Sequence, residues 1–175
     1  MMKYGNLDIT APQLSGIPFN ETEVLGAAVW LWMHSESHRD APLHTLSSLL
    51  LPAISQRQFI LVSEEIKPVF YLSWAMMSED AEQRYLSNHS TCMPIDDWNS
   101  GERMWILDWV APFGHTHSLR PLVADLFPNR CFRGLQHRGN ERGARIMKYK
   151  GREVSKEQAR EWFAAHPVEY KGVQQ

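Results

Sequence analysis

The chain has 175 residues, 43% of them hydrophobic, enough to bury one substantial core but hardly two. Its 18 Lys and Arg against 20 Asp and Glu give a net charge of −2, so it lacks the basic excess with which proteins bind nucleic-acid phosphates. The longest apolar run, Val24 to Met33, is too short to span a bilayer of about 30 Å, and residues 1–20 contain no signal-peptide pattern. We therefore expect a cytoplasmic protein, with no membrane span, in which a flexible arm at 1–20 precedes a single domain at 21–175.

Periodicity predicts intermixed helices and strands. Asn20 is the expected N-cap of a largely apolar helix at 21–35. The further expected elements, in chain order, are a helix at 44–54 ended by Pro52, strands at 58–65 and 69–78 joined as a hairpin, a helix at 78–88, a strand at 103–114, a helix at 117–127, strands at 130–139 and 144–151, and a helix at 154–166 with Ser155 as N-cap. This order predicts an α+β fold with a central, mostly antiparallel sheet flanked by helices.

Two histidines follow the first predicted helix in the stretch WLWMHSESHRD. His34 and His38 are four positions apart, a spacing that presents both rings on one helical face, as in the zinc motif H-E-x-x-H. Ser35 replaces the glutamate of that motif, and His115 or His117 would have to supply the third ligand. We therefore expect no metal site, and packing or surface roles for most histidines.

The same stretch also fits a nucleophile and base. Ser35 and His38 are three apart, and Asp108, inside the apolar run WILDWVAPFG, could orient the imidazole. A carboxylate among aromatic residues needs a partner or a function to offset its desolvation. An ion pair with an arginine would satisfy it as well as catalysis would. The residues alone leave both interpretations open and slightly favour the ion pair.

Six motifs, taken together, carry a family resemblance. In order and spacing, WLWMHSESHRD, LPAI, QFILVSEE, KPVFYLSWA, DDWNSGERMWILDW and VAPFG resemble the lysine acyltransferases that activate RTX protoxins, the family of the hemolysin activator. The resemblance runs from about Leu25 to Phe127. It implies a GNAT-like fold, a homodimer, an acyl carrier protein loaded with a fatty acid as donor, and internal lysines of an RTX protoxin as acceptors. No bound cofactor is expected. The stretch APFGHTHSLR has no R-x-x-G-x-G pattern, the phosphate cradle that a coenzyme A donor would use.

The resemblance also assigns site residues. It maps His38 onto the essential histidine, Ser35 onto the serine beside it and Asp108 onto the functionally important aspartate. A lysine amine, with an ordinary pKa of about 10.4, must lose a proton before it attacks a thioester, and an imidazole, at about 6.5, is a suitable acceptor. Asp108 would fix the tautomer of His38, while Ser35 would orient His38 or donate to the thioester oxygen. Direct transfer ranks above an acyl-serine intermediate, because a thioester is already activated.

Further residues are expected to contact substrate or carrier. The expected substrate-binding residues are Arg39 of the S-x-x-H-R element and three tryptophans that could line an acyl groove, Trp30, Trp32 and Trp74. The segment 130–152 is strongly basic, and the expected docking residues for an acidic carrier are Arg133, Arg138, Arg142, Arg145 and Lys148. A solvated strand pair is the alternative explanation of these charges.

One departure from the family pattern and two other functions stay open. Relatives place a tryptophan where the stretch HRDAP has Ala41, which puts the preferred acyl chain in doubt. The chain could be a non-catalytic adaptor that binds a carrier or a toxin. It could also be a lysine acyltransferase whose acceptor is not a toxin.

Overall fold

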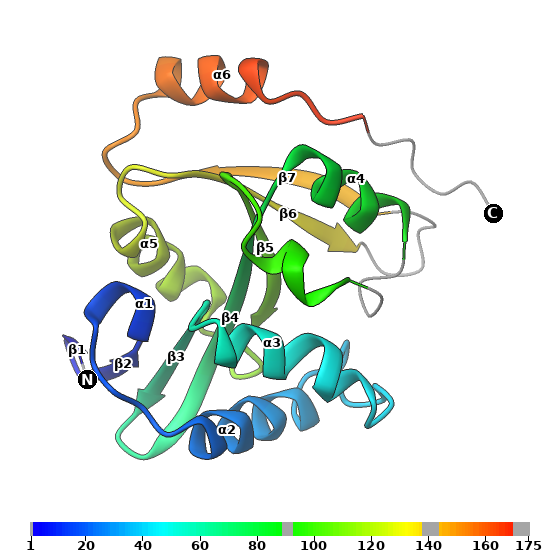
Figure 1. Cartoon of the computed structure of the whole chain (residues 1–175). Coiled ribbons are helices and arrows are strands. Elements are labelled where there is room, and N and C mark those ends of the chain that lie inside the picture. The colour runs from blue at the N-terminus through cyan, green and yellow to red at the C-terminus, as the bar shows by residue number, and fades with distance from the viewer. Residues whose placement is uncertain (1, 89–92, 138–143, 170–175) are drawn as a thin grey trace.

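The computed structural model describes residues 2–88, 93–137 and 144–169. Within these residues, one sheet contains seven strands side by side in sequence order (Figure 1). The strands are β1 (Met2–Tyr4), β2 (Leu7–Thr10), β3 (Phe59–Glu64), β4 (Lys67–Met77), β5 (Arg103–Val110), β6 (Cys131–His137) and β7 (Ala144–Lys150). Neighbours are antiparallel except for the parallel pair β5 and β6. The predicted α+β fold with a mostly antiparallel sheet is confirmed.

The helices follow the predicted order from residue 21 onward. They are α1 (Pro12–Ser15), α2 (Glu21–Met33), α3 (Leu51–Ser55) after a π-helical turn (Leu46–Leu50), α4 (Glu79–Ser87), a 3-10 turn (Ile95–Trp98), α5 (Thr116–Leu126) and α6 (Lys156–Ala165). Asn20 caps α2 by accepting from the N–H groups of Thr22 and Glu23, and Ser155 forms a capping box on α6. The prediction that Pro52 ends a helix is wrong. Pro52 lies in the first turn of α3, where its missing N–H has no intrahelical acceptor.

The predicted flexible arm at 1–20 is also wrong for its described residues. Strand β2 pairs with β3 from Leu7↔Glu64 to Thr10↔Leu61, and β1 extends the sheet beyond β2. Ile9 is 2% exposed because it packs into the core on one face of the sheet. These strands therefore belong to the sheet and bury apolar surface with it.

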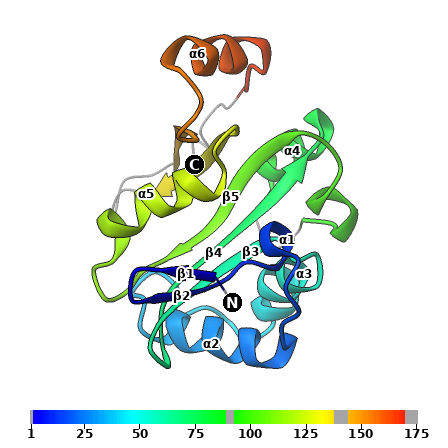
Figure 2. The same ribbon diagram turned by 90° about the vertical axis from the view of Figure 1, so that its left-hand side faces the viewer.

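Alternating side chains of the central strands fill cores on both faces of the sheet. On one face Leu72, Trp74 and Ile106 pack with α5. On the other, Tyr71 and Val110 pack with α2, and further along the sheet other side chains pack with α4. Figure 2 shows α5 on one side of the sheet and α3 and α4 on the other. Among the described residues, no helix combines the length and the apolar character needed to cross a bilayer.

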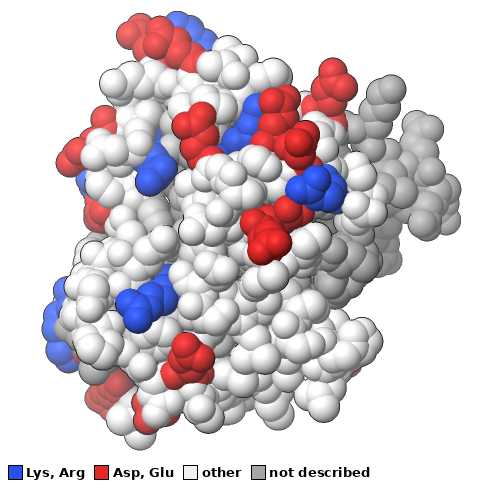
Figure 3. All heavy atoms as spheres, in the orientation of Figure 1, with Lys and Arg blue, Asp and Glu red and all other residues white. Residues whose placement is uncertain are grey.

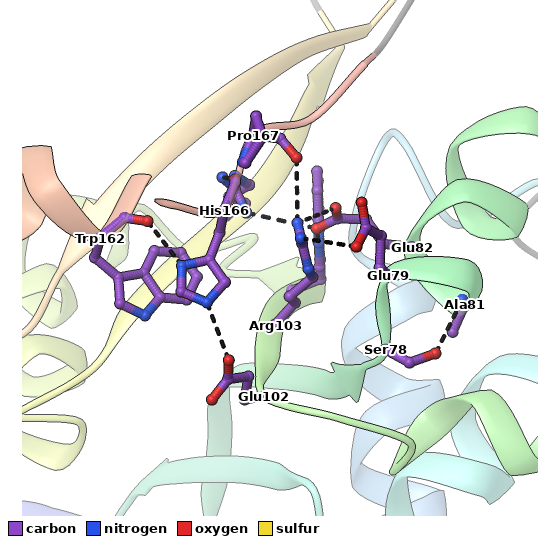
Figure 4. A network of polar contacts seen from close by, with 11 residues as sticks. Ser78, Glu79, Ala81, Glu82, Glu102, Arg103, Trp162, His166 and Pro167 are labelled. Atoms are coloured by element: carbon purple, nitrogen blue, oxygen red, sulfur yellow. Dashed lines mark hydrogen bonds and ion pairs between the residues drawn. The ribbon is translucent and has the colours of Figure 1, made fainter. Parts of the chain in front are cut away.

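A buried charge network connects α4 to β5 and β6 (Figure 4). Glu82 of α4 accepts from Arg103 Nη1 at 2.8 Å, Trp105 Nε1 at 2.6 Å and Arg133 Nη1 at 3.5 Å. Arg103 and Arg133 also donate to the backbone carbonyls of Pro167 and His166, just after α6. The network therefore fastens the end of α6 to the sheet.

Candidate active site

The end of α2 places His38 over the sheet. After Met33 the chain turns, and the N–H groups of His38 and Arg39 both donate to the carbonyl oxygen of Ser35, at 3.0 and 2.9 Å. This turn lays the imidazole against the indole of Trp32, with ring centroids 5.0 Å apart. His38 thus lies beside the helix end, half-buried, with 20% of its side chain exposed.

His38 and Asp108 form a close pair. Nε2 of His38 lies 3.1 Å from Oδ1 of Asp108, and Oδ2 of the same carboxylate accepts from Trp32 Nε1 at 3.2 Å. Only 11% of the Asp108 side chain is exposed. Because an ionised carboxylate only accepts hydrogen bonds, Nε2 of His38 carries a proton and Nδ1 is the free basic nitrogen of a neutral ring. The buried carboxylate therefore has a histidine partner, not the arginine of the alternative interpretation.

A β-bulge in β5 directs the side chain of Asp108 toward His38. Ser73 of β4 pairs with Asp108, whereas the next residue, Trp74, pairs with Ile106, so Leu107 is an extra residue in β5. A bulge bends its strand and redirects the neighbouring side chains. Here it places Asp108 on the face covered by α2.

Two hydroxyl groups face the basic nitrogen of His38. The Oγ atoms of Ser35 and Ser37 lie 2.8 and 2.9 Å from Nδ1, and 3.2 Å from each other. One hydroxyl can donate to Nδ1 while the other donates to its neighbour. The result is a hydroxyl–imidazole–carboxylate array, the arrangement with which enzymes activate a nucleophile or move a proton.

A hollow of about 520 Å³ opens beside this array. Its wall includes His38 and Asp108, while Ser37, but not Ser35, lies on its surface. The largely apolar remainder of the wall consists of Trp32, Ala41, Pro42, Thr45, Leu49, Ser73, Tyr85, Met93, Leu107, Trp109, Leu135 and Gln136. An apolar hollow with a few convergent polar groups is the usual form of a site for a small organic group.

The model of the RTX toxin acyltransferase family matches residues 17–150. The chain belongs to this family. The RTX-I toxin-activating lysine-acyltransferase of Actinobacillus pleuropneumoniae is 36% identical over 86% of this chain and 87% of its own length. A protein-lysine myristoyltransferase of Escherichia coli is 35% identical over 81% and 82%. A protein-lysine palmitoyltransferase of Bordetella bronchiseptica is 38% identical over 86% and 81%. The predicted RTX toxin acyltransferase family, and with it an acyltransferase, is confirmed.

The structure brings together only part of the site predicted for this RTX toxin acyltransferase. Ser35, His38, Asp108 and Trp32 meet, as described above. Trp74 does not join them: it is 2% exposed in the core on the α5 side, against Phe127, so its prediction as a groove residue is wrong.

Two other predicted substrate-binding residues lie outside the hollow. Trp30 packs against His34 and Phe113, with ring centroids 4.2 and 5.6 Å away. The Arg39 side chain is 58% exposed and lies 3.9 Å from Asp40. His34 donates from Nδ1 to the Trp30 carbonyl at 2.7 Å. The described residues contain no cluster of three His, Cys, Asp or Glu that could hold a metal ion.

The predicted docking residues separate into three groups. Arg133 is 1% exposed and binds Glu82, so its prediction as a surface docking residue is wrong. Burial lowers its pKa from the ordinary value, while the charge of Glu82 opposes that shift. Arg145 and Lys148 are exposed. Arg138 and Arg142 lie outside the described residues.

Sequence reasoning missed three features of the site. Ser37 stands next to His38 and could have been noticed for its hydroxyl, but no spacing rule selects it. The indole bond from Trp32 to Asp108 and the bulge at Leu107 depend on contacts between distant segments. No local pattern signals such contacts.

Proposed function

We propose that this protein transfers a fatty acyl chain from an acyl carrier protein to internal lysine amines of an RTX protoxin and thereby activates it. One observation carries the proposal: the serine–His38–Asp108 array lies on the wall of a largely apolar hollow. The relatives are named as a toxin-activating lysine acyltransferase, a myristoyltransferase and a palmitoyltransferase, and these activities supply the reaction class.

His38 is the base in this proposal. With Nε2 engaged by Asp108, Nδ1 takes a proton from the attacking amine, directly or through a serine hydroxyl. The Asp108 carboxylate then stabilises the imidazolium that forms. Since Ser37 lines the hollow and Ser35 does not, Ser37 is the hydroxyl closer to an incoming amine. Direct transfer remains our preferred route over an acyl-serine.

The donor thioester would enter where β5 and β6 separate. Their pairing runs from Met104↔Phe132 to Ile106↔Gly134, although β5 continues to Val110 and β6 to His137. A second hollow, of about 400 Å³, lies on the α5 side of this opening and shares Trp109, Leu135 and Gln136 with the first. Backbone groups free of ladder bonds can pair with the amides of a phosphopantetheine arm, as an added strand would. This arrangement supports the GNAT-like fold that the resemblance implies.

The carrier protein would dock on the α5 side. Arg120 and Lys150 line the second hollow, and Arg145 shares its face of β7 with Tyr149, another residue of that wall. Arg145 therefore stays in the proposed docking surface, whereas Lys148 lies on the other face of β7, with its amine over the Phe163 ring of α6. The surface over α4 is less suitable for an acidic carrier, because acidic side chains gather there on the face shown in Figure 3. If docking is electrostatic, added salt should weaken carrier binding. A carrier affinity that is the same at low and high salt would contradict this docking surface.

The test is intact-mass analysis of a protoxin fragment incubated with this protein and acyl-loaded carrier. We expect a fatty-acyl mass gain on lysine that His38→Ala abolishes. His34→Ala is the matched control, because His34 makes no contact with Asp108 among the described residues and should leave the gain intact.

The other outcomes separate the remaining candidates. Carrier or toxin binding without any mass gain identifies the non-catalytic adaptor. A gain on another protein, and none on a protoxin, identifies a different acceptor. The homodimer and the cytoplasmic location also remain part of this proposal, and sedimentation and cell fractionation test them.

A further inference from the structure

Ser73 carries a buried hydroxyl that has no role in the site described so far. The residue is 1% exposed, and within the described part of the chain its Oγ makes no hydrogen bond of standard geometry. Yet Ser73 lines the hollow that contains His38 and Asp108. Buried hydroxyls in folded proteins nearly always find a partner, since an unpaired one costs free energy. Two groups can supply that partner: the hydroxyl of Tyr71 on the same strand, and the group that fills the hollow.

The pairing of β4 with β5 fixes where this hydroxyl lies. Ser73 is directly opposite Asp108, and residues directly opposite each other in an antiparallel pair project from the same face of the sheet. The bulge at Leu107 begins immediately after this pair. Ser73 and the catalytic carboxylate therefore form neighbouring parts of one wall.

Three neighbouring hydroxyls, those of Tyr71, Ser35 and Ser37, are less suitable as donors to a group in the hollow. Tyr71 lies on the same face of β4, and burial, with the charge of Asp108 as second cause, raises its pKa well above the ordinary value, while a side-chain hydrogen bond with the Ser73 hydroxyl opposes that shift. The phenol therefore stays neutral, and Tyr71 is not part of the hollow's wall. The hydroxyls of Ser35 and Ser37 are engaged with His38 Nδ1 and with each other. Because the Ser73 oxygen can accept from the neutral Tyr71 phenol, its own proton stays available to a group in the hollow that Ser73 lines.

We propose that Ser73 is a further catalytic residue, whose hydroxyl donates a hydrogen bond to the thioester carbonyl oxygen of the acyl donor. This inference rests on the proposed acyl transfer. When the neutral lysine nitrogen bonds to the carbonyl carbon, the C=O electron pair moves onto oxygen, which becomes negative. The C–S bond then breaks and C=O re-forms. The proton from nitrogen passes to His38 and then to the departing thiolate, so the carrier leaves as a thiol and the lysine as an amide. A donor already in place at the oxygen lowers the energy of the charged intermediate.

Ser73→Ala should lower activity far more than stability. Because the hydroxyl makes no hydrogen bond of standard geometry in the free protein, its removal should change the melting temperature little. Loss of the donor should lower kcat by about 100-fold. It should leave the pH dependence of kcat unchanged, since His38 and Asp108 keep their contacts. Ser63→Ala, on the adjacent strand β3 and outside this hollow, is the matched control and should keep the wild-type rate.

Each result decides the matter. A folded Ser73→Ala protein with kcat within about twofold of wild type overturns the assignment, because one oxyanion donor is normally worth far more. A lowered melting temperature with unchanged kcat assigns Ser73 a structural role and also overturns it. If the wild-type protein transfers no acyl chain, the proposed function is wrong and the Ser73 assignment falls with it. If the wild type is active and Ser73→Ala is equally active, only the Ser73 assignment is wrong.

Discussion

The indole nitrogen of Trp32 donates to Asp108 Oδ2 at 3.2 Å, while the other carboxylate oxygen binds His38. Trp32 belongs to α2 and His38 to the turn that follows it, so one helix end supplies both groups that hold the carboxylate. A carboxylate bound at both oxygens keeps one orientation. In the proposed mechanism, Trp32 is therefore a positioning residue for the His38 base.

Replacing this indole tests its role. Trp32→Phe keeps an aromatic ring but removes the N–H donor. Because the lost bond is to a charged acceptor, we expect destabilisation of about 1–3 kcal/mol. We also expect acyl transfer to slow by about 10- to 100-fold, because Asp108 can then rotate away from His38. Urea unfolding and the mass assay measure the two effects. Trp30→Phe, whose ring packs on Phe113, is the control, and equal rates for both variants would contradict the role.

The two serines on Nδ1 should substitute for each other. In Ser35→Ala or Ser37→Ala, one hydroxyl still faces His38, so each single variant should keep at least about a tenth of the wild-type rate. The double variant should lose more than the product of the single losses, as expected for groups that share a partner. Single-turnover rates of all three variants measure this. Abolition of transfer by one single change, with an acyl-enzyme trapped in the wild type, would instead establish a serine nucleophile.

Glu82 should be critical for stability. It is fully buried and neutralises Arg103 and Arg133, whose side chains are 8% and 2% exposed. Among the described residues, Glu82→Gln keeps the shape but leaves the buried guanidinium of Arg133 without an ion-pair partner and that of Arg103 with only the exposed Glu79. We expect a loss of about 3–5 kcal/mol in the free energy of unfolding. Urea unfolding checks it, with Glu79→Gln as control because Glu79 is 71% exposed and lies 3.6 Å from Arg103. Similar losses for both variants would contradict a special role for the buried charge.

Asp97 should make stability depend on pH in the acid range. It accepts from Arg84 Nε at 2.8 Å and Nη2 at 2.7 Å, and these hydrogen bonds lower its pKa below the ordinary value. The unfolded chain then binds a proton at this carboxylate more readily than the folded chain does. The stabilisation is therefore complete above the unfolded pKa of about 3.9 and is lost as pH falls through the lower folded value.

Arg84→Gln should lower the melting temperature at neutral pH and flatten its fall below about pH 4. Melting curves over this range test it. The control is Arg39→Gln, since Arg39 and Asp40 form an exposed pair 3.9 Å apart. Wild-type and Arg84→Gln curves that stay parallel down to low pH would contradict the assignment.

Some of the structure could be predicted because it follows from local pattern. The helices and strands after residue 21 follow the hydrophobic periodicity and the helix caps. The partner of Asp108 was also predictable in general terms, because a buried carboxylate needs a polar partner to offset its desolvation. Burial of Arg133 could not be predicted, because its partner Glu82 is 51 residues away in sequence. Likewise, β2 is a strand because β3 offers it an edge, and nothing in its own short sequence fixes that pairing.

The separation of β5 from β6 has a consequence for the order of events. A blind pocket would admit two large proteins only in turn, and the enzyme would have to store the acyl group on itself between visits. Here the hollows on the two faces of the sheet share Trp109, Leu135 and Gln136, so in the proposed reaction carrier and protoxin can approach one thioester from opposite sides. Such a site favours a ternary complex, so initial-rate plots that vary both substrates should intersect rather than run parallel.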